Sequence, residues 1–519
     1  MSPITTLFDD WRIALASLAV CGISLYLISS SMAGAKKTGI PGPNGLPLIG
    51  NAHQMPPDRP WLTFSSWKQL YGDIIHLNIL GKPIIVLNSS KIAKDLMDKK
   101  SSIYSDRPIL LMAKLCGFYD NFVLLPYGNE WRNQRRLIVH DFSPSMTPRY
   151  YELQETAART LVRNLLKKPE SFRDEIQLRI GMIILRVAYG YKVESRADPM
   201  LSMALAVLRN FSFAIAPGQW IVDIIPALQY IPKWFPGAGF RKTADDWRNL
   251  TIAGLQNPYF WCKANTLQET GKALSPSLCG RYIEETGENM TPEAEFSLVW
   301  AAAAVFGGGL DTNMSAVLTF FRAMIANPHV VAKAQEEIDR VIGRDRLPSI
   351  DDRPNLPYVR SVIAEVLRYG PPAPMGVAHS VTQDDYYEGY FIPKGSIILP
   401  NIWHMTHDPE IYPNPDKFDP DRFEGQDSEM GKIYDLVFGF GRRVCPGLHL
   451  AQGTLFAIVA TTLATCDVLP GLDRSGRGLM PTTDYENGSI VMPEPYSLRL
   501  KPRSTHAVNL LSEASAEID

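Results

Sequence analysis

The most apolar stretch of the chain lies near its N-terminus. Residues 13–34 carry no charge, and this length is enough for a helix to cross a hydrocarbon core of about 30 Å. Acidic residues 9–10 precede the stretch and lysines 36–37 follow it, a charge order that places the following domain in the cytoplasm. A cleavable secretory signal is the alternative, because residues 31–33 resemble a small-residue cleavage site. We favour an uncleaved membrane anchor over residues 1–34.

The rest of the chain has a mostly helical pattern. Apolar residues recur at helical spacing between residues 145 and 370, whereas runs typical of strands are short. Gly81 and Lys82 join two of these runs in the manner of a hairpin turn. We therefore expect a mainly α fold with small β-sheets. The expected strands are residues 74–80, 83–87, 397–399 and 496–500.

One predicted helix is unusually long and apolar. It begins at Thr291, with Pro292 in the first turn, and ends at the proline that follows Asn327. At 1.5 Å per residue it spans about 50 Å, so it crosses a whole domain and must be buried on nearly every side. Three glycines, residues 307–309, interrupt it, although each costs about 1 kcal/mol relative to alanine. They indicate either a close helix crossing or a ligand lying flat against the helix.

Composition narrows the class of protein. The chain has 519 residues, 45% of them apolar, and 52 basic against 54 acidic side chains. This balance excludes a disordered chain and a nucleic-acid partner bound through bulk positive charge. Length alone suggests about three or four domains, but the long central helix favours one large domain over residues 35–503. Residues 504–519 lack a core pattern, and we expect a disordered tail there.

One cysteine differs from the other five. Cys445 lies in the segment FGFGRRVCPG, residues 438–447, ahead of an apolar helix. With Pro446 in the first turn of that helix, Cys445 would lie at its positive end, where the dipole and neighbouring arginines lower the pKa of a thiol. Such a thiolate is either a nucleophile or a metal ligand. We favour the ligand, because His449 has no partner to orient it as a base.

The segment around Cys445 resembles the heme-binding signature of the cytochrome P450 superfamily, F-x-x-G-x-R-x-C-x-G. The remaining motifs of that superfamily follow its order, and the resemblance covers roughly residues 38–502. Residues 387–423 are most similar to fungal microsomal (class II) members, including those of toxin and terpenoid pathways. The further motifs are Trp131-x-x-x-Arg135, Gly308-Gly309-Leu310-Asp311-Thr312, Glu365-x-x-Arg368 and Asp421-Arg422-Phe423.

The resemblance implies a heme b cofactor with Cys445 as the axial iron ligand. A thiolate ligand pushes electron density toward iron and favours cleavage of the O–O bond. Glycines in the loop let backbone N–H groups approach the sulfur. His379 is either a propionate ligand or a structural histidine, and we expect His404 and His407 to be structural. The implied heme-binding residues are Cys445, Arg443, Trp131, Arg135, His379, Phe438, Gly441 and Gly447.

Two further sets of residues have implied roles besides heme binding. Glu365 and Arg368 lie one turn apart, so they can pair, and Arg422 is expected to complete a buried structural triad. Asp311 and Thr312 are the implied catalytic residues, an acid and an alcohol that relay protons during oxygen activation. Asn313 stands where many relatives carry a second hydroxyl residue.

The substrate is implied only as a class. Residues 211–237 are rich in aromatic and aliphatic side chains interrupted by proline, which is typical either of a core segment or of a rim that dips into a membrane. The second reading favours a lipophilic substrate that arrives from the bilayer. The implied pocket residues are Phe118, Phe306, Gly308, Pro374, Met375, Val377 and Ile490.

Three functions remain open at this point. The first is an NADPH- and O2-dependent monooxygenase of fungal secondary metabolism (terpenoid or polyketide). It would be anchored in the endoplasmic reticulum membrane by a single span, face the cytoplasm, and receive electrons from NADPH–cytochrome P450 reductase, with cytochrome b5 as a further donor. The second is a heme-thiolate isomerase or dehydratase that needs no reductase. The third is a non-catalytic, membrane-anchored heme or lipid carrier. Retention of Asp311 and Thr312 favours the first.

Overall fold

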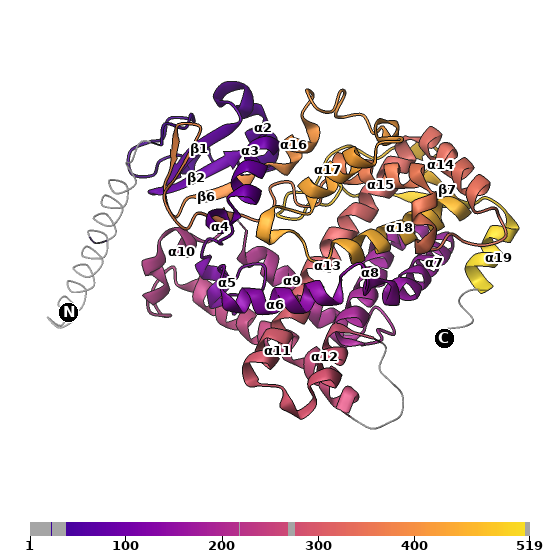
Figure 1. Ribbon diagram of the computed structural model, residues 1–519, viewed down its shortest axis with the longest axis horizontal. Coiled ribbons are helices and arrows are strands. Elements are labelled where there is room, and N and C mark those ends of the chain that lie inside the picture. The colour runs from indigo at the N-terminus through magenta and orange to yellow at the C-terminus, as the bar shows by residue number, and fades with distance from the viewer. Residues whose placement is uncertain (1–21, 23–37, 217, 268–275, 514–519) are drawn as a thin grey trace, which may run out of the picture. The chain divides into compact units, whose positions relative to one another are not determined.

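The computed structural model describes residues 22, 38–216, 218–267 and 276–513 (Figure 1). Apart from Gly22, the expected membrane anchor at residues 1–34 lies outside the described residues. The chain divides into two compact units. The first comprises residues 1–108 and 378–401, and the second comprises residues 109–377 and 402–519. Each unit is described by itself.

A four-stranded sheet organises the first unit, in the order β1-β2-β6-β3. β1 and β2 form an antiparallel hairpin in which Ile79 pairs with Lys82. The turn therefore consists of Leu80 and Gly81, both in the left-handed conformation, one residue earlier than predicted. β6 pairs in parallel with β2, and β3 is antiparallel to β6. The bounds are β1 Ile74–Ile79, β2 Lys82–Leu87, β3 His379–Ser380 and β6 Ile397–Pro400.

Short helices and a small hairpin complete the first unit. Asn401 ties the sheet to α2 because its amide donates to the carbonyl of Trp61 and to Asn88. The remaining elements are η1 Ala52–Gln54, α2 Pro60–Tyr71, α3 Ser90–Ala93, η2 Lys94–Lys99, α4 Ser101–Tyr104, β4 Asp385–Tyr387 and β5 Tyr390–Ile392.

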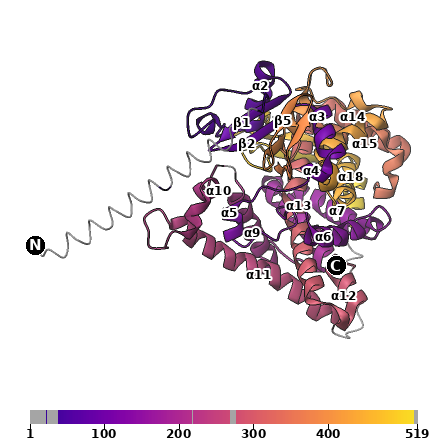
Figure 2. The same ribbon diagram turned by 60° about the vertical axis from the view of Figure 1, so that its left-hand side comes forward.

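The second unit is built around the long helix α13, Pro292–Ala326, as predicted. The side chain of Thr291 caps its first turn by accepting from the N–H of Ala294. Both views place α13 inside the helices of this unit (Figures 1 and 2). Most of its side chains are buried, since helices cover it on several sides. Its main neighbours are α6 Asn129–Asp141, α8 Phe172–Tyr189, α15 Pro357–Tyr369 and α18 Leu448–Thr465.

Further helices and a three-stranded sheet surround this core. α11 packs on α9 along one side of the unit (Figure 2). The other helices are α5 Leu111–Leu115, α7 Tyr151–Lys167, α9 Pro199–Ala214, α10 Ile221–Ile224, α11 Gly239–Leu267, α12 Leu278–Thr286, α14 Pro328–Val341, α16 Ile402–His407, α17 Asp427–Val437 and α19 Thr505–Glu513. The strands, in the order β8-β7-β9, are β7 Cys466–Leu472, β8 Gly478–Leu479 and β9 Leu498–Pro502.

Two boundaries near the C-terminus differ from expectation. β9 begins two residues later than predicted, because its register with β7 pairs Leu498 with Pro470. The predicted disordered tail is wrong for residues 505–513, which form α19. Leu511 from this helix is buried against Val162 and Cys466. A short amphipathic helix at the chain end can therefore be held by a few apolar contacts, even where the sequence shows no long periodic pattern.

Among the described residues, α18 is the helix long and apolar enough to cross a membrane. It is 78% buried inside the second unit, where it packs against α7 and α13. A helix that is apolar all round and covered by protein is a core helix. α18 therefore gives no support for a membrane span.

Candidate functional site

The loop from Phe438 to Gly447 joins α17 to α18 and presents Cys445. The backbone N–H of Cys445 donates to the carbonyl of Phe438 at 2.7 Å, which closes the loop on itself. Gly439 and Gly441 have φ values of 88° and 54°, a left-handed conformation that glycine adopts without a steric penalty. The two glycines of the motif therefore let the chain turn tightly enough to bring Cys445 back beside Phe438.

The environment of the Cys445 thiol has opposing effects on its pKa. Burial raises the pKa above its ordinary value, whereas the backbone N–H of Gly447 and the charge of Arg135 lower it. The predicted net lowering is thus wrong for the thiol on its own, because desolvation outweighs both favourable contributions. In addition, α18 begins only at Leu448, so Pro446 precedes the helix. A bound metal cation changes this balance, since a coordinating thiol is deprotonated outright.

An arginine of this loop and two residues of α6 lie close together. Trp131 and Arg135 are one turn apart on α6, and the Arg135 guanidinium lies 5.4 Å from the Trp131 ring. Arg135 also donates to the carbonyl of Val444 at 2.9 Å. Arg443 lies 4.6 Å from the same ring and donates to the carbonyl of Leu125 at 2.7 Å. Three of the predicted heme-binding residues are thereby gathered beside Cys445.

The donor set around Trp131 fits an anionic ligand. The indole Nε1 of Trp131 is buried and has no hydrogen-bond partner among the described residues. An unsatisfied buried donor is costly and calls for a partner. Two guanidinium groups lie over the same ring. The hydrogen-bond acceptor that suits this site is therefore a negatively charged one. The carboxylates of heme propionates fit this donor set.

His379 belongs to the first unit. Its side chain is buried, and Nδ1 lies 2.6 Å from the carbonyl oxygen of Tyr104, which fixes the orientation of the ring. In β3, His379 and Ser380 pair with Ile398 and Ile397 of β6. This contact supports the structural reading of His379 directly and leaves the propionate reading as a prediction.

The triple glycine of α13 serves two purposes at two different residues. A Cβ atom on Gly309 would lie 2.7 Å from Cδ1 of Ile184, so this glycine allows α8 to pack closely against α13. Gly308 is exposed in the middle of an otherwise buried helix, and a Cβ there would meet no atom within 4 Å. The close helix crossing is found at Gly309, and Gly308 offers an open backbone surface that fits a flat group such as heme.

The acid and alcohol of α13 follow these glycines directly. The hydroxyl of Thr312 donates to the carbonyl of Gly308 at 2.7 Å, and the amide of Asn313 donates to Gly309 at the same distance. Burial raises the pKa of Asp311, so its carboxyl binds a proton more readily near neutral pH than an exposed aspartate does. Asp311 can therefore hold a proton, and Thr312 has a hydroxyl that can pass one on.

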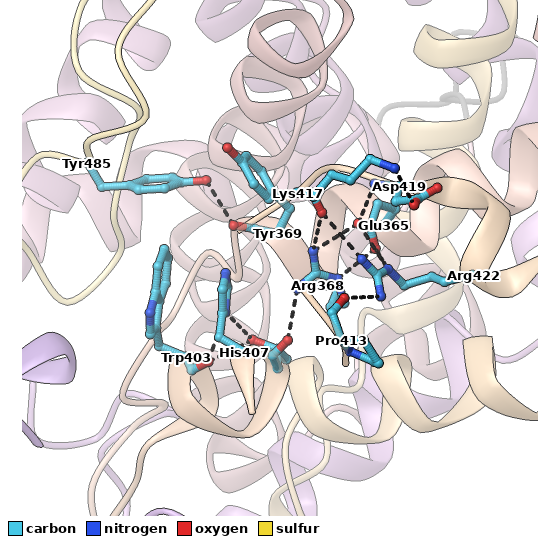
Figure 3. Close-up of polar contacts among 11 residues, drawn as sticks. Glu365, Arg368, Tyr369, Trp403, His407, Pro413, Lys417, Asp419, Arg422 and Tyr485 are labelled. Carbon is cyan, nitrogen blue, oxygen red and sulfur yellow. Dashed lines mark hydrogen bonds and ion pairs between the residues drawn. The ribbon is translucent and has the colours of Figure 1, made fainter. Parts of the chain in front are cut away.

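The predicted charged triad lies together in the second unit (Figure 3). Glu365 and Arg368 form a double hydrogen bond of 2.6 and 2.8 Å, and both side chains are fully buried. Nε of Arg422 lies 3.3 Å from the Glu365 carboxylate. The pairing between neighbouring turns of α15 follows from the spacing of three residues.

Backbone groups extend this triad in a way that the sequence motif did not indicate. Glu365 also accepts from the N–H of Asp419 at 2.7 Å. Arg368 donates to the carbonyls of Thr406 and Lys417 at 3.0 and 3.2 Å. The triad therefore holds the segment around residues 406–422 through its main chain. Because every residue type carries a C=O, and every type except proline an N–H, no side-chain signal could have identified these partners.

His407 lies at the edge of the same network. Its ring stacks on Trp403 at 4.1 Å, and Nδ1 contacts the Trp403 carbonyl at 2.9 Å. Burial, reinforced by the charge of Arg368, lowers the pKa of His407 to about 3. A histidine that is held neutral in an aromatic stack has a packing role, as expected for this residue.

The implied pocket residues differ in their surroundings and in their exposure. Phe118 is buried in a cluster with Phe211, with ring centroids 5.2 Å apart, and Phe306 is buried in the main core. Val377 is exposed, whereas Pro374 is buried. A hollow of about 490 Å³ lies in the first unit, between residues 40–51 and the side of β1, and none of these candidates lines it.

Comparison with known proteins identifies the family. The family model for cytochrome P450 matches residues 40–499. Cytochrome P450 monooxygenase 105 of Postia placenta is 50% identical over 476 residues, which cover 92% of this chain and 91% of the relative. Cytochrome P450 monooxygenase claR of Ampulloclitocybe clavipes is 38% identical, with 96% and 93% covered. The corresponding values for cytochrome P450 monooxygenase ppsD of Aspergillus oryzae are 35%, 96% and 96%.

These findings decide between the three functions left open by the sequence. The relatives are named monooxygenases over nearly the whole chain, and nothing favours the carrier or the isomerase. A redox partner and a small-molecule substrate follow from that reaction. The chain therefore belongs to the cytochrome P450 family and is a heme-thiolate monooxygenase, an oxidoreductase.

Proposed function

We propose that Cys445 is the axial ligand of the heme iron, in a loop shaped by Phe438, Gly441 and Gly447. The observation that carries this proposal is the placement of the Gly447 N–H and the Arg135 charge beside one half-buried thiol, with Arg135 held by its bond to the Val444 carbonyl at 2.9 Å. Both contributions stabilise a thiolate, and hydrogen bonding to the sulfur tunes the potential of the metal. When bound, the heme supplies the activation of dioxygen.

The propionates are assigned to the cationic side of this loop. Trp131, Arg135 and Arg443 provide the donors, and the unpartnered Nε1 of Trp131 supports the assignment. His379 is a further propionate donor in this proposal. Charge-assisted hydrogen bonds of this kind fix an anionic ligand in position as well as in energy.

Asp311 and Thr312 form the proton path. Burial raises the pKa of Asp311, so its carboxyl takes up a proton more readily than that of an exposed aspartate, and Thr312 is oriented by its bond to the Gly308 carbonyl. We expect Thr312→Ala to form less product per NADPH consumed, since a positioned acid–base group contributes about 10²–10⁴-fold to a proton transfer. Full coupling in that variant would contradict the relay, and Thr266→Ala on α11 is the matched control.

A lipophilic substrate is supported by an exposed apolar surface between α9 and α11. Tyr230 and Trp234 are 79% and 75% exposed. Exposed aromatic and aliphatic side chains that gather in one region are typical of membrane or partner contact. The remaining members of this patch are Phe213, Ile221 and Phe235. The pocket itself is assigned to Phe118, Phe306, Gly308, Pro374, Met375, Val377 and Ile490.

We also propose a cellular setting for the enzyme. The proposed enzyme is anchored in the endoplasmic reticulum membrane, faces the cytoplasm, and receives electrons from NADPH–cytochrome P450 reductase, with cytochrome b5 as an additional donor. The proposed substrates are terpenoid or polyketide precursors of fungal secondary metabolism. The exposed patch and the resemblance of residues 387–423 to microsomal members support this setting.

Two measurements test the proposal. The reduced protein treated with carbon monoxide should give the long-wavelength Soret band of a thiolate-ligated complex, and Cys445→Ser should lose it while Cys466→Ser retains it. Cys466 is a suitable control because it is a buried free thiol in β7. Expression in a host that contains the reductase, fed with terpenoid and polyketide precursors, should then give oxygenated products. A thiolate band that survives Cys445→Ser would refute the ligand assignment.

A further inference from the structure

A polar stripe runs along one face of the buried helix α13. Ser315, Thr319 and Arg322 follow Thr312 at spacings of three or four residues, so they lie on the same side of the helix. All three are buried, and Arg322 is only 3% exposed. Polar residues in an apolar helix interior are costly unless they bind something. The stripe therefore calls for an explanation beyond packing.

Arg322 is the most unusual member of the stripe. Its Nη1 donates to the carbonyl of Asp484 at 2.9 Å, and its guanidinium lies 4.2 Å from the Tyr485 ring and 5.6 Å from the Tyr369 ring. Its Nε and Nη2 have no hydrogen-bond partner among the described residues, and no carboxylate there pairs with it. In this part of the chain, the positive charge of Arg322 is therefore stabilised by two aromatic rings and one carbonyl.

The stripe attaches residues 484–493 to α13 at two points. Arg322 binds the carbonyl at the start of this segment, and the hydroxyl of Ser315 donates to the carbonyl of Val491 at 2.6 Å. Between these points the segment folds back on itself, with Glu486 donating to Met492 at 2.8 Å. The segment is consequently held at both ends of a narrow loop.

The same contacts reach residues 369–377, the segment that follows α15. Val491 donates to the carbonyl of Pro372 at 2.9 Å, and the Tyr485 hydroxyl lies 3.4 Å from the Tyr369 carbonyl (Figure 3). A Cβ atom on Gly370 would lie 2.1 Å from the Tyr485 hydroxyl and 3.0 Å from Oγ1 of Thr319. Glycine is needed there because all three segments meet at this residue.

Both attached segments carry implied pocket residues, Pro374 to Val377 on one and Ile490 on the other. We propose that Arg322 is a positioning residue that sets the shape of the substrate pocket, by holding residues 484–493 and, through Tyr485, residues 369–377 against α13. This inference rests on the proposed function, because it takes these segments as pocket walls. Arg322 acts through these two segments in this proposal, without a contact of its own to substrate or heme being required.

The experiment compares azoles that differ in size and in the position of a phenyl ring, using the full-length heme-loaded protein. Imidazole, 1-phenylimidazole and 4-phenylimidazole are titrated, and the Soret shift gives each Kd. In Arg322→Met we expect the ratio of the two phenylimidazole Kd values to change by about fivefold or more, since small changes in an apolar pocket discriminate strongly between shapes. The Kd for imidazole and the heme content should stay close to wild type.

The matched control is Arg503→Met. Arg503 also donates to a backbone carbonyl, that of Ala464 at 3.0 Å, and pairs with Asp339. Its loss should lower the melting temperature without changing the azole ratio. An unchanged ratio in heme-loaded Arg322→Met overturns the proposal, and so does an equal weakening of all three azoles, which indicates general loosening.

Tyr485→Phe covers the case in which Arg322→Met binds no heme. The variant keeps the ring against Arg322 and removes only the hydroxyl that joins the two segments, so we expect a smaller change of the ratio in the same direction. A wild-type ratio in Tyr485→Phe then overturns the proposal. If the wild-type protein itself lacks the thiolate–carbon monoxide band, the proposed function has failed. A wild type that has the band but whose variants keep its azole ratio refutes the role of Arg322 alone.

Discussion

The second unit buries two arginines in opposite ways. Arg368 is fully buried and paired with an equally buried carboxylate, Glu365, and its other donors bind main-chain carbonyls. Arg322 is 3% exposed, binds one carbonyl and lies near two tyrosine rings, and two of its nitrogens have no hydrogen-bond partner among the described residues. The first arrangement is a closed network, and the second is an incomplete one.

The difference indicates the role of each arginine in the protein. In a closed network every member is needed, so it fixes one backbone arrangement and tolerates no loss. An incomplete site contributes little to stability and is retained for another reason, which we assign to the shape of the pocket. Comparing substitutions in the two sites therefore separates a residue that holds the fold from one that adjusts it.

The largest effect is expected when the closed network is opened. Glu365→Ala leaves Arg368 and Arg422 without their shared carboxylate, and an uncompensated buried charge costs about 3–5 kcal/mol. We expect protein without bound heme, measured by the heme-to-protein ratio and by thermal unfolding. Glu424→Ala, which removes an exposed carboxylate from a neighbouring segment, is the control. A normal heme content in Glu365→Ala would rule out the structural role of the triad.

His407 reports on the closed network through pH. Burial and the charge of Arg368 lower its folded-state pKa to about 3, whereas the unfolded chain takes up a proton near the ordinary value of about 6.5. The unfolded state thus binds more protons between these two values, so the free energy of unfolding falls as the pH drops below about 6.5. Between about pH 7.5 and pH 5.5 the loss from this group is about 1.4 kcal/mol.

His407→Phe isolates this contribution. The variant keeps a ring against Trp403 but cannot titrate, so its stability should vary less over the same pH range. Urea unfolding at the two pH values gives the difference. An identical pH dependence in both proteins would mean that His407 is not held neutral beside Arg368.

Arg322→Met should have a smaller effect on stability than on pocket shape. The substitution removes one hydrogen bond, to the Asp484 carbonyl, worth about 1 kcal/mol. Removing the unpartnered guanidinium donors offsets part of that loss, and methionine retains much of the volume. We expect a decrease of about 1 kcal/mol or less in urea unfolding. If Arg322→Met lowered the free energy of unfolding as much as Glu365→Ala does, the two sites would contribute equally to stability. The distinction between a closed and an incomplete network would then be wrong.

The contrast between Glu365–Arg368 and Arg322 also shows how much of the fold and of the site the sequence could predict. The long helix was predicted to within a residue, because Thr291 caps it and Pro328 begins the next helix. The pairing of Glu365 with Arg368 was also predictable, since helical spacing alone brings them together. Local signals of this kind do not depend on the rest of the fold.

The features that the sequence could not predict depend on long-range contacts. The pKa of Cys445 was predicted in the wrong direction, because burial comes from segments distant in the chain. The helix at residues 505–513 is held by contacts with α7 and β7. Arg322 gave no motif signal either. Its proposed role depends on the contact between residues 369–377 and residues 484–493 beside α13, which only the structure shows.

The smallest change in the free energy of unfolding is expected at an exposed cation, Lys333, which has two carboxylate partners where Arg322 has none among the described residues. Lys333 contacts Asp421 at 2.9 Å and Glu424 at 2.8 Å, and these carboxylates raise its pKa. All three side chains are largely exposed, so water and salt screen the attraction. Lys333→Ala should therefore change the free energy of unfolding by about 0.5 kcal/mol or less, and less still at high salt. A loss above about 2 kcal/mol in urea unfolding would show that pairing rather than burial governs how much a cation matters in this fold.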